Sequence, residues 1–232
     1  MSYSGRFASG LEDQVSQRAN CHRGTDFEGD DASSALFAQT MSLVALTVGV
    51  FAIGGHLGRS LSPNVGFVFF FGALVCLFTM RFAERRSGTS AMGWLFIFGA
   101  LMGLASSPTV AYYASTNPEA LWQAGGATAL FMIGLGSTGY ATRRDLSALG
   151  RLSFWALFAL ILFGVLLIFV QVPNGEVVYS VLGLVIFAGL PIFDFQRLRR
   201  NRNMDSAPLM AMSIFLDILN VFFFLNLRNR RE

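Results

Sequence analysis

Seven long apolar segments, separated by short polar loops, constrain this chain more than any other feature of its sequence. They cover about residues 35–57, 63–82, 91–113, 118–140, 152–172, 177–198 and 208–227. A helix needs about 20 apolar residues to cross a bilayer, and an isolated segment in lipid must satisfy its own backbone hydrogen bonds. The segments lack the alternation and the length of about ten residues that barrel strands show. The sequence therefore predicts an all-α membrane protein with seven transmembrane helices.

The composition supports this class and excludes others. Only 13% of the 232 residues are charged and 53% are hydrophobic, whereas soluble domains carry about 25% charged residues. A soluble enzyme, a disordered protein and a disulfide-rich secreted domain are therefore excluded. Residues 1–34 are polar and acidic and do not resemble a signal peptide. We expect them to form a disordered tail that precedes a transmembrane domain over residues 35–232.

The basic residues, all 17 of them arginines, predict the orientation of the chain. Pairs or triplets of arginine follow the second, fourth and sixth segments, whereas the loops after the first, third and fifth segments contain a single arginine, Arg59. Because short cytoplasmic loops are enriched in basic residues, the amino terminus is predicted to be cytoplasmic. The basic residues at 228–231 disagree, since seven spans place the carboxyl end outside. Topology also explains the pI of about 9.2, so no nucleic-acid partner is expected.

Two segments begin with residues that are typical of helix starts. Ser62-Pro63 precedes the second segment, and Asn117-Pro118 precedes the fourth. A serine or asparagine side chain can accept a hydrogen bond from a free backbone N–H of the first turn, and proline is favoured at the first helical position. Both pairs therefore predict where a helix begins.

Two carboxylates lie inside apolar segments, where an ionisable residue is costly and by default marks a functional site. Asp194 lies about one turn from the Arg-rich end of the sixth segment, and Asp217 lies roughly 15 Å into the seventh at ~1.5 Å per residue. The short connecting loop predicts antiparallel neighbours whose carboxylates face one another. Two carboxylates in a dry pocket cannot both ionise cheaply and titrate as a unit. We expect a gate that is closed when the aspartate pair is protonated and that attracts a cation when the pair is deprotonated. The alternative is that one Asp serves helix packing and the other lies near the interface.

Three further residues are candidates to support this pair. Pro191 lies three residues before Asp194 and frees a backbone carbonyl near it, or is a tolerated packing kink. Arg81 ends the second segment on the same side and is a candidate latch for Asp194, although it could equally be an interfacial arginine. Asn220, three residues after Asp217, is on the same helical face and could help to hold a cation or could join helices.

Other motifs do not point to a cofactor. Residues 134–139 match the GxGxxG pattern, but they close an apolar helix and lack the flanking strand and acid of a nucleotide site. We interpret these glycines, together with Gly125 and Gly126, as helix-packing positions. The two histidines, His22 and His56, show no metal-ligand spacing, so no cofactor is expected.

Three stretches of the chain resemble the Bax inhibitor-1 family, also called transmembrane Bax inhibitor motif proteins. The likeness covers about 200 residues and is most specific in the Asp-x-Gln of the sixth segment and the Leu-Asp-Ile-x-Asn of the seventh. The stretches are Gly99-Ala-Leu-Met-Gly-Leu-Ala-Ser-Ser-Pro108 with Tyr112-Tyr113, then Ile186-Phe-Ala-Gly-Leu-Pro-Ile-Phe-Asp-Phe-Gln196, and Ser213-Ile-Phe-Leu-Asp-Ile-Leu-Asn220 with Phe222 to Leu225.

The resemblance implies a seven-helix fold in which the last helix is central and surrounded by the other six. Bacterial members are regarded as pH-sensitive calcium leak channels, and their paired membrane aspartates match Asp194 and Asp217, which would then bind Ca²⁺ transiently. A latch arginine of the family corresponds loosely to Arg81. Another branch resembles modulators and clients of an FtsH-type membrane protease, recognised through the amino-terminal tail.

Three hypotheses about function therefore remain open. A pH-gated cation leak in the cell inner membrane requires Asp194 and Asp217. A binding protein that modulates an FtsH-type protease, a membrane-anchored AAA protease, depends instead on the tail and the cytoplasmic loops. An intramembrane aspartyl protease also uses two aspartates, but its usual Tyr-Asp and Gly-x-Gly-Asp patterns are absent here. We favour the leak, in a protein that is not an enzyme and is a monomer rather than an oligomer, with the bilayer and cations as its partners.

Overall fold

The computed structural model describes residues 33–83, 88–142, 144–170, 173, 175–201 and 203–228. A few side chains inside helices, including that of Arg81, lie outside this description, as does the predicted tail apart from residues 33 and 34. Within the described residues, every regular element is a helix. The prediction of an all-α membrane protein is therefore confirmed.

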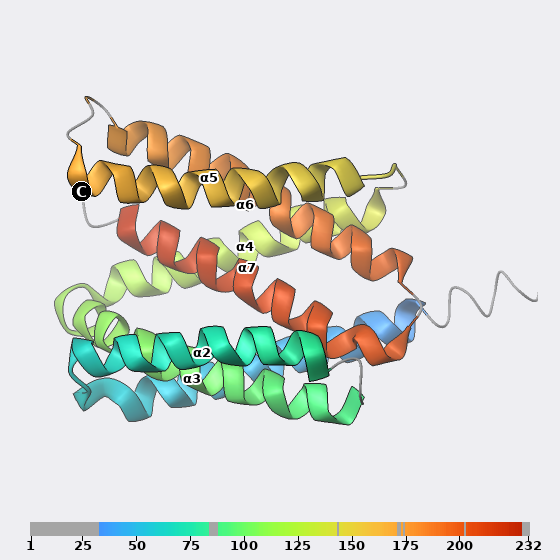
Figure 1. Ribbon diagram of the computed structural model, residues 1–232, viewed down its shortest axis with the longest axis horizontal. Helices are drawn as coiled ribbons and strands as arrows, with labels where there is room; N and C mark the ends of the chain where they lie inside the picture. Colours follow the sequence, from blue (N-terminus) through green and yellow to red (C-terminus); the bar gives the residue numbers. More distant parts are fainter. Residues whose placement is uncertain are drawn as a thin grey trace, which may run out of the picture.

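Seven long helices and two short 3-10 helices make up the described part of the chain (Figure 1). The first helix covers residues 33–57 and continues into η1 (Gly58–Ser60). It is followed by α2 (Pro63–Ala83), α3 (Gly88–Thr116), α4 (Pro118–Ala141), α5 (Ser147–Phe169), α6 (Gly175–Arg200), η2 (Met204–Ser206) and α7 (Ala207–Arg228).

Six of these helices are long and apolar enough to cross a membrane. The exception, α4, has 24 residues, and a helix of that length spans roughly 36 Å. It contains no stretch that is apolar enough, and its sequence is rich in glycine, serine and threonine. The chain is a multi-span membrane protein. Its helix α4 is long enough to cross a bilayer but is not among the six helices that are also apolar enough.

The predicted helix starts are confirmed, whereas one predicted segment is displaced. Pro63 is the first residue of α2, and the side chain of Asn117 accepts a hydrogen bond of 3.0 Å from the backbone N–H of Ala120. The fifth segment was predicted at 152–172, but α5 begins at Ser147 and ends at Phe169. The charged Arg151 interrupts the apolar run, so hydropathy placed the start of the segment after the first turn of α5.

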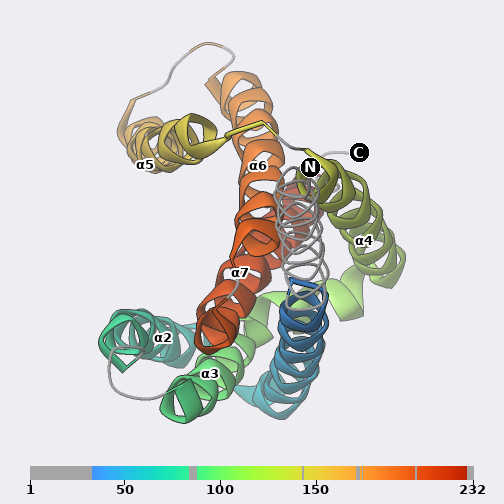
Figure 2. The same cartoon turned by 90° about the vertical axis from the view of Figure 1, so that its right-hand side faces the viewer.

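The last helix, α7, is the central one, as predicted. Half of its apolar span is buried within the protein, whereas the other five apolar spans bury 17–28%. It contacts α3, α4 and α6, and Figures 1 and 2 show it running obliquely through the middle of the bundle. The helices α2 and α3 pack mainly on each other, while α4 and α5 pack on α6. The hydrophobic core lies where these groups meet α7, around Phe98, Leu198 and Phe215.

Close helix pairs are built on glycines, which lets two backbones approach. A Cβ atom at Gly54 would lie 2.8 Å from the carbonyl oxygen of Ala100, and one at Gly103 would overlap the carbonyl oxygen of Phe51, so the first helix and α3 are in backbone contact. In α4, a Cβ atom at Gly139 would overlap the backbone of Ile192 of α6.

The prediction that every glycine of α4 serves packing is only partly correct. Gly136 and Gly139 of the GxGxxG stretch contact α6, as expected of a packing motif. However, Gly125, Gly126 and Gly134 have no atom within 4 Å of a Cβ placed on them. That interpretation was wrong for these three residues, because they face away from the neighbouring helices.

Candidate functional site

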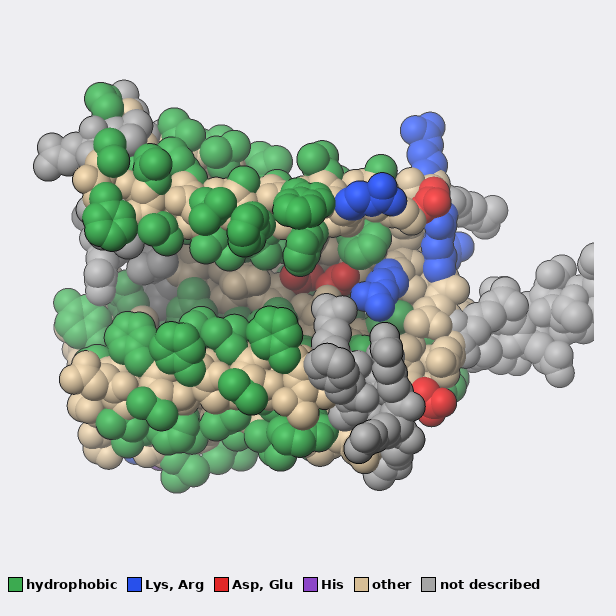
Figure 3. Space-filling view, viewed as in Figure 1, with side chains coloured by type: hydrophobic (Ala, Val, Ile, Leu, Met, Phe, Trp, Pro, Cys, Tyr) green, Lys and Arg blue, Asp and Glu red, His purple; other side chains and the backbone are tan. Residues whose placement is uncertain are grey.

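A hollow opens on one side of the bundle between α2 and α5. Figure 3 shows acidic side chains at its floor, over α6 and α7, with a basic side chain beside them. Next to it a small cavity of about 50 Å³ lies between α2, α6 and α7. Its lining residues are Leu77, Arg197, Leu209, Met212, Ser213 and Leu216. Polar side chains thus reach a recess at the Arg-rich end of an otherwise apolar bundle.

The two predicted aspartates come together at this place. Asp194 of α6 and Asp217 of α7 are buried, with 9% and 5% of their surface exposed. Their two carboxyl groups lie close enough to interact electrostatically. A carboxylate is only an acceptor, so two carboxyl groups can hydrogen-bond to each other only when one of them carries a proton. Two helices thus bring a pair of buried carboxyl groups together, an arrangement that favours one shared proton over two charges.

The two carboxyl groups have different surroundings. Oδ2 of Asp194 accepts a hydrogen bond from the hydroxyl of Ser213 on α7. Oδ2 of Asp217 is buried and has no hydrogen-bond partner among the described residues. A buried polar atom without a partner is costly, and such atoms are where a protein can accept a ligand or change its protonation. Asp217 therefore holds the unsatisfied acceptor of the pair.

Sequence reasoning missed two residues of this recess, Ser213 and Arg197. Ser213 lies four residues before Asp217, and Arg197 lies three residues after Asp194. Side chains at these spacings share one helical face, so the signal was present in the sequence. Arg197 is exposed and lines the cavity together with Ser213, which places a cation near the pair on α6 itself.

Pro191, the third predicted support, lies in the same helix as Asp194. It is fully buried inside α6, one turn before Asp194. Proline has no N–H, so the carbonyl of residue 187 loses its partner in the helix. The next residue, Ile192, lies against the backbone of α4 at Gly139. The irregular turn is thus held by a neighbouring helix rather than by lipid.

The other two predicted supports are not joined to the pair in the described structure. The backbone of Arg81 lies in the last turn of α2, but its side chain, and with it the predicted latch, lies outside the described residues. Asn220 is half-buried one turn beyond Asp217. None of the hydrogen bonds among the described side chains connects it to Asp217.

The end of α6 beyond the pair is fastened to the loop between α4 and α5. Gln196 is almost fully buried; its Oε1 accepts a 3.0 Å hydrogen bond from the N–H of Leu146, and its Nε2 donates to the carbonyl of Arg144. Nearby, Arg200 forms an ion pair of 3.0 Å with Asp145. These contacts hold the Arg-rich end of α6 in place and explain the glutamine of the Asp-x-Gln motif.

The site offers oxygen ligands but not a closed metal cage. No group of three or more His, Cys, Asp or Glu side chains lies within reach of a single metal ion in the described part of the chain. Two carboxyl groups and a hydroxyl are the hard oxygen ligands that Ca²⁺ prefers, but Ca²⁺ in a stable site takes 6–8 of them. The arrangement suits transient rather than stable binding of a cation.

The chain was compared with known proteins and families. The family profile described as "Inhibitor of apoptosis-promoting Bax1" matches residues 33–227, which include all seven long helices. An uncharacterized membrane protein of Vibrio cholerae is 28% identical over 190 residues, 80% of this chain and 82% of the relative. One of Streptococcus pyogenes serotype M1 is 27% identical over 213 residues, 84% and 92% of the two chains. An uncharacterized protein of Deinococcus radiodurans is 32% identical over 170 residues, 69% and 71% of the two chains. Together with the seven-helix fold, the match shows that the chain belongs to the Bax inhibitor-1 family of membrane proteins.

Proposed function

We propose that the protein is a pH-sensitive leak for Ca²⁺ or other cations across the cell inner membrane, gated by Asp194 and Asp217. The observation that carries this proposal is the contact between their two buried carboxyl groups, one of them on the central helix. Charged residues inside membrane bundles mark ion pathways and proton relays. The pair lies beside a recess that opens at one end of the bundle.

The gate follows from the proton shared by the pair. With that proton in place, the two carboxyl groups can hydrogen-bond to each other, in addition to the bond from Ser213 of α7 to Asp194 of α6. When the proton leaves, two like charges face each other, and at about 4 Å they repel by roughly 4 kcal/mol at an effective dielectric constant of ~20. The repulsion is relieved when the helices separate or when a cation enters. Both outcomes open a path for cations at higher pH.

The orientation of the leak rests on the arginines. Arg144, Arg197, Arg199 and Arg200 lie on the loop after α4 and at the end of α6, and short basic loops remain in the cytoplasm. We therefore place the recess and the amino terminus on the cytoplasmic side. The proton that opens or closes the leak is then a cytoplasmic one.

The test is Ca²⁺ flux into liposomes that contain the purified full-length protein and a Ca²⁺-sensitive dye, at about pH 6 and about pH 8, because an interacting pair of carboxyl groups titrates as a unit. Asp194→Asn and Asp217→Asn are compared with Asp205→Asn, which removes an exposed acid in η2. Wild type and Asp205→Asn are expected to conduct several-fold faster at the higher pH. Both pair variants are expected to lose this difference.

Two outcomes would overturn the proposal. The first is flux no greater than that of empty liposomes at both pH values. The second is a pH-dependent flux that survives both substitutions, because the leak would then not use the pair. Circular dichroism and the elution profile of each variant establish that it is folded before its flux is compared.

A further inference from the structure

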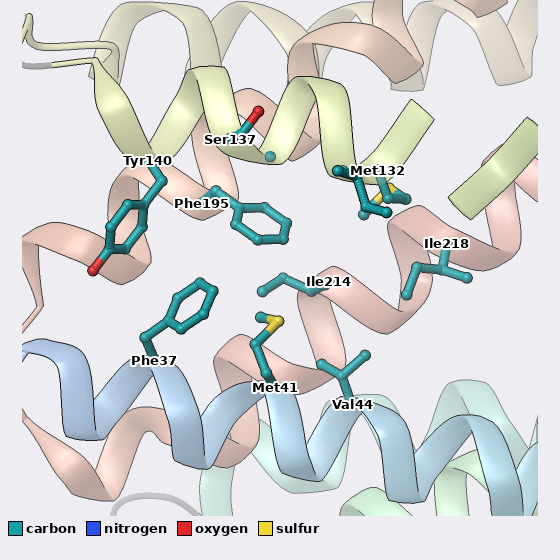
Figure 4. A pocket seen from close by; sticks show the side chains of 11 residues that line it. Phe37, Met41, Val44, Met132, Ser137, Tyr140, Phe195, Ile214 and Ile218 are labelled. Carbon is teal, nitrogen blue, oxygen red and sulfur yellow. The ribbon is translucent and has the colours of Figure 1, made fainter. Parts of the chain in front are cut away.

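A second, larger cavity lies on another side of the bundle, between the first helix and α4. It measures about 430 Å³ and has α6 and α7 at its floor. Met41 and Val44 form one wall, Met132 of α4 stands on the other, and Ile214 and Ile218 of α7 form part of the floor (Figure 4). Ile133 is 68% exposed although it lines the cavity. The cavity is therefore a groove that opens sideways from the bundle.

The groove offers almost no polar group to a ligand. The hydroxyl of Ser137 donates to the carbonyl of Gly134 in its own helix, at 2.9 Å, and Figure 4 shows the hydroxyl of Tyr140 pointing away from the groove. Water in such a space lacks the two to four polar partners that it needs. An apolar ligand is the only kind that the lining can hold well.

One end of the groove is closed by aromatic rings and carries a cation. Phe37 packs edge-on against Tyr140, with ring centroids 5.0 Å apart. The guanidinium of Arg199 lies 5.8 Å from the centroid of the Tyr140 ring and donates to the carbonyl of Tyr140 at 2.8 Å. No carboxylate in the described part of the chain forms an ion pair with Arg199. Among the described residues, Arg199 is thus a cation without a carboxylate partner, at the place where the apolar groove reaches the Arg-rich end of the bundle.

We propose that this groove binds one acyl chain of an anionic phospholipid, with the lipid phosphate at Arg199. A methylene group takes about the volume of a water molecule, ~30 Å³, so 430 Å³ matches roughly one chain of 14 methylenes. Arginine matches phosphate geometrically and in charge. The site is separate from Asp194, Asp217 and the recess beside them, so the assignment does not depend on cation conduction.

The test counts phospholipids that stay bound to the purified, delipidated full-length protein by native mass spectrometry. The protein is offered equal amounts of phosphatidylglycerol and phosphatidylcholine with the same acyl chains. Wild type is expected to retain one phosphatidylglycerol in preference to phosphatidylcholine. Met41→Trp fills the groove, and it is expected to lower retention about tenfold, which corresponds to ~1.4 kcal/mol. Leu46→Trp is the matched control, since Leu46 is in the same helix, is 58% exposed and does not line the groove.

The headgroup part of the proposal has its own variant. Arg199→Gln keeps a donor for the carbonyl of Tyr140 but removes the charge. It is expected to retain lipid while losing the preference for phosphatidylglycerol. Wild type that retains no phospholipid, or Met41→Trp that retains as much as Leu46→Trp, would overturn the site; an unchanged preference in Arg199→Gln would overturn the phosphate contact. If Met41→Trp does not fold, Val44→Phe fills the same groove, and the wild-type measurement still decides.

Discussion

The hydroxyl of Ser213 donates a hydrogen bond to Oδ2 of Asp194, and thereby joins the first half of α7 to the last turns of α6. Ser213 is one turn before Asp217 on the central helix, so the same face of α7 holds both the donor to one carboxyl group and the other carboxyl group. The hydrogen bond between α6 and α7 thus lies at about the same depth in the bundle as the aspartate pair. The aspartate pair is therefore a three-residue arrangement in which Ser213 sets the position of Asp194.

Replacing Ser213 by alanine is expected to weaken this junction. Loss of one partner from a buried hydrogen bond costs about 1–3 kcal/mol because the remaining group stays desolvated. The thermal unfolding midpoint in detergent should fall for Ser213→Ala and should recover in Ser213→Thr, which keeps the hydroxyl. Ser106→Ala is the control, since the hydroxyl of Ser106 bonds only within α3, to Met102 and Gly103, among the described contacts. Equal losses in Ser213→Ala and Ser106→Ala would argue against a special role for the junction.

Gly103 is expected to be the least replaceable glycine of α3. A Cβ atom there would overlap the carbonyl oxygen of Phe51 and lie 3.0 Å from the N–H nitrogen of Gly55, both of which are backbone atoms that cannot rotate away. Gly103→Ala should therefore push the first helix from α3 and destabilise the protein by about 1–3 kcal/mol. Thermal unfolding in detergent measures the change.

The matched control for Gly103 lies in the same helix. Gly93 is exposed and has nothing within 4 Å of an added Cβ. Alanine is favoured over glycine in a helix by up to ~1 kcal/mol, so Gly93→Ala should leave the midpoint unchanged or raise it. If both alanine variants behave alike, the backbone contact between the first helix and α3 does not limit stability.

The sequence predicted the helices and the aspartate pair because the membrane imposes rules that a sequence displays directly. A span must be long and apolar, so α2 was predicted at 63–82 and found at Pro63–Ala83. An acid inside a span is rare enough to single out Asp194 and Asp217. The short connection between α6 and α7 was then enough to predict that the two carboxyl groups meet, as they do.

The rotation of each helix about its axis could not be predicted in the same way. Lipid and protein interior are both apolar, so a membrane helix does not need a polar face that would mark its outer side. Hence Gly125 and Gly139 of α4 look alike in the sequence, although one faces open space and the other the backbone of α6. The partnership of Gln196 with the loop at Leu146, 50 residues earlier in the chain, likewise depends on how α5 and α6 are placed.

Gln196 is expected to control the opening of the loop between α4 and α5. Gln196→Met removes the acceptor for the N–H of Leu146 and the donor to the carbonyl of Arg144, and each lost hydrogen bond contributes about 0.5–1.5 kcal/mol. Trypsin should then cleave after Arg144 several-fold faster, as followed by the mass of the fragments. Gln123→Met is the control, because Gln123 bonds only to the exposed Glu119 of its own helix among the described contacts. A cleavage rate at Arg144 that is equal in both variants would contradict this role.

Asp145, in the same loop and outside the spans, is expected to make a pH-dependent contribution to stability. The hydroxyl and then the N–H of Ser147 donate to its carboxylate, and with the Arg200 guanidinium they hold the pKa of Asp145 below its ordinary value of 3.8. A carboxylate whose pKa is lower in the folded state stabilises that state above the unfolded pKa and loses this effect as the pH falls through the folded pKa. Wild type should therefore unfold at a higher temperature than Asp145→Asn at neutral pH and at about pH 5, and the difference should decline as the pH falls below 3.8.

Salt separates the two causes of this effect. The Arg200 ion pair is exposed and is screened at ~1 M salt, where the Debye length is about 3 Å, whereas the hydrogen bonds from Ser147 are not. Because the Ser147 bonds are the larger cause of the lowered pKa, most of the difference between wild type and Asp145→Asn should survive high salt. Asp205→Asn, which removes an exposed acid at η2, is the control variant under the same conditions. A difference that disappears in high salt would assign the effect to Arg200 instead, and α6 would then be fastened to the loop by charge rather than by Ser147.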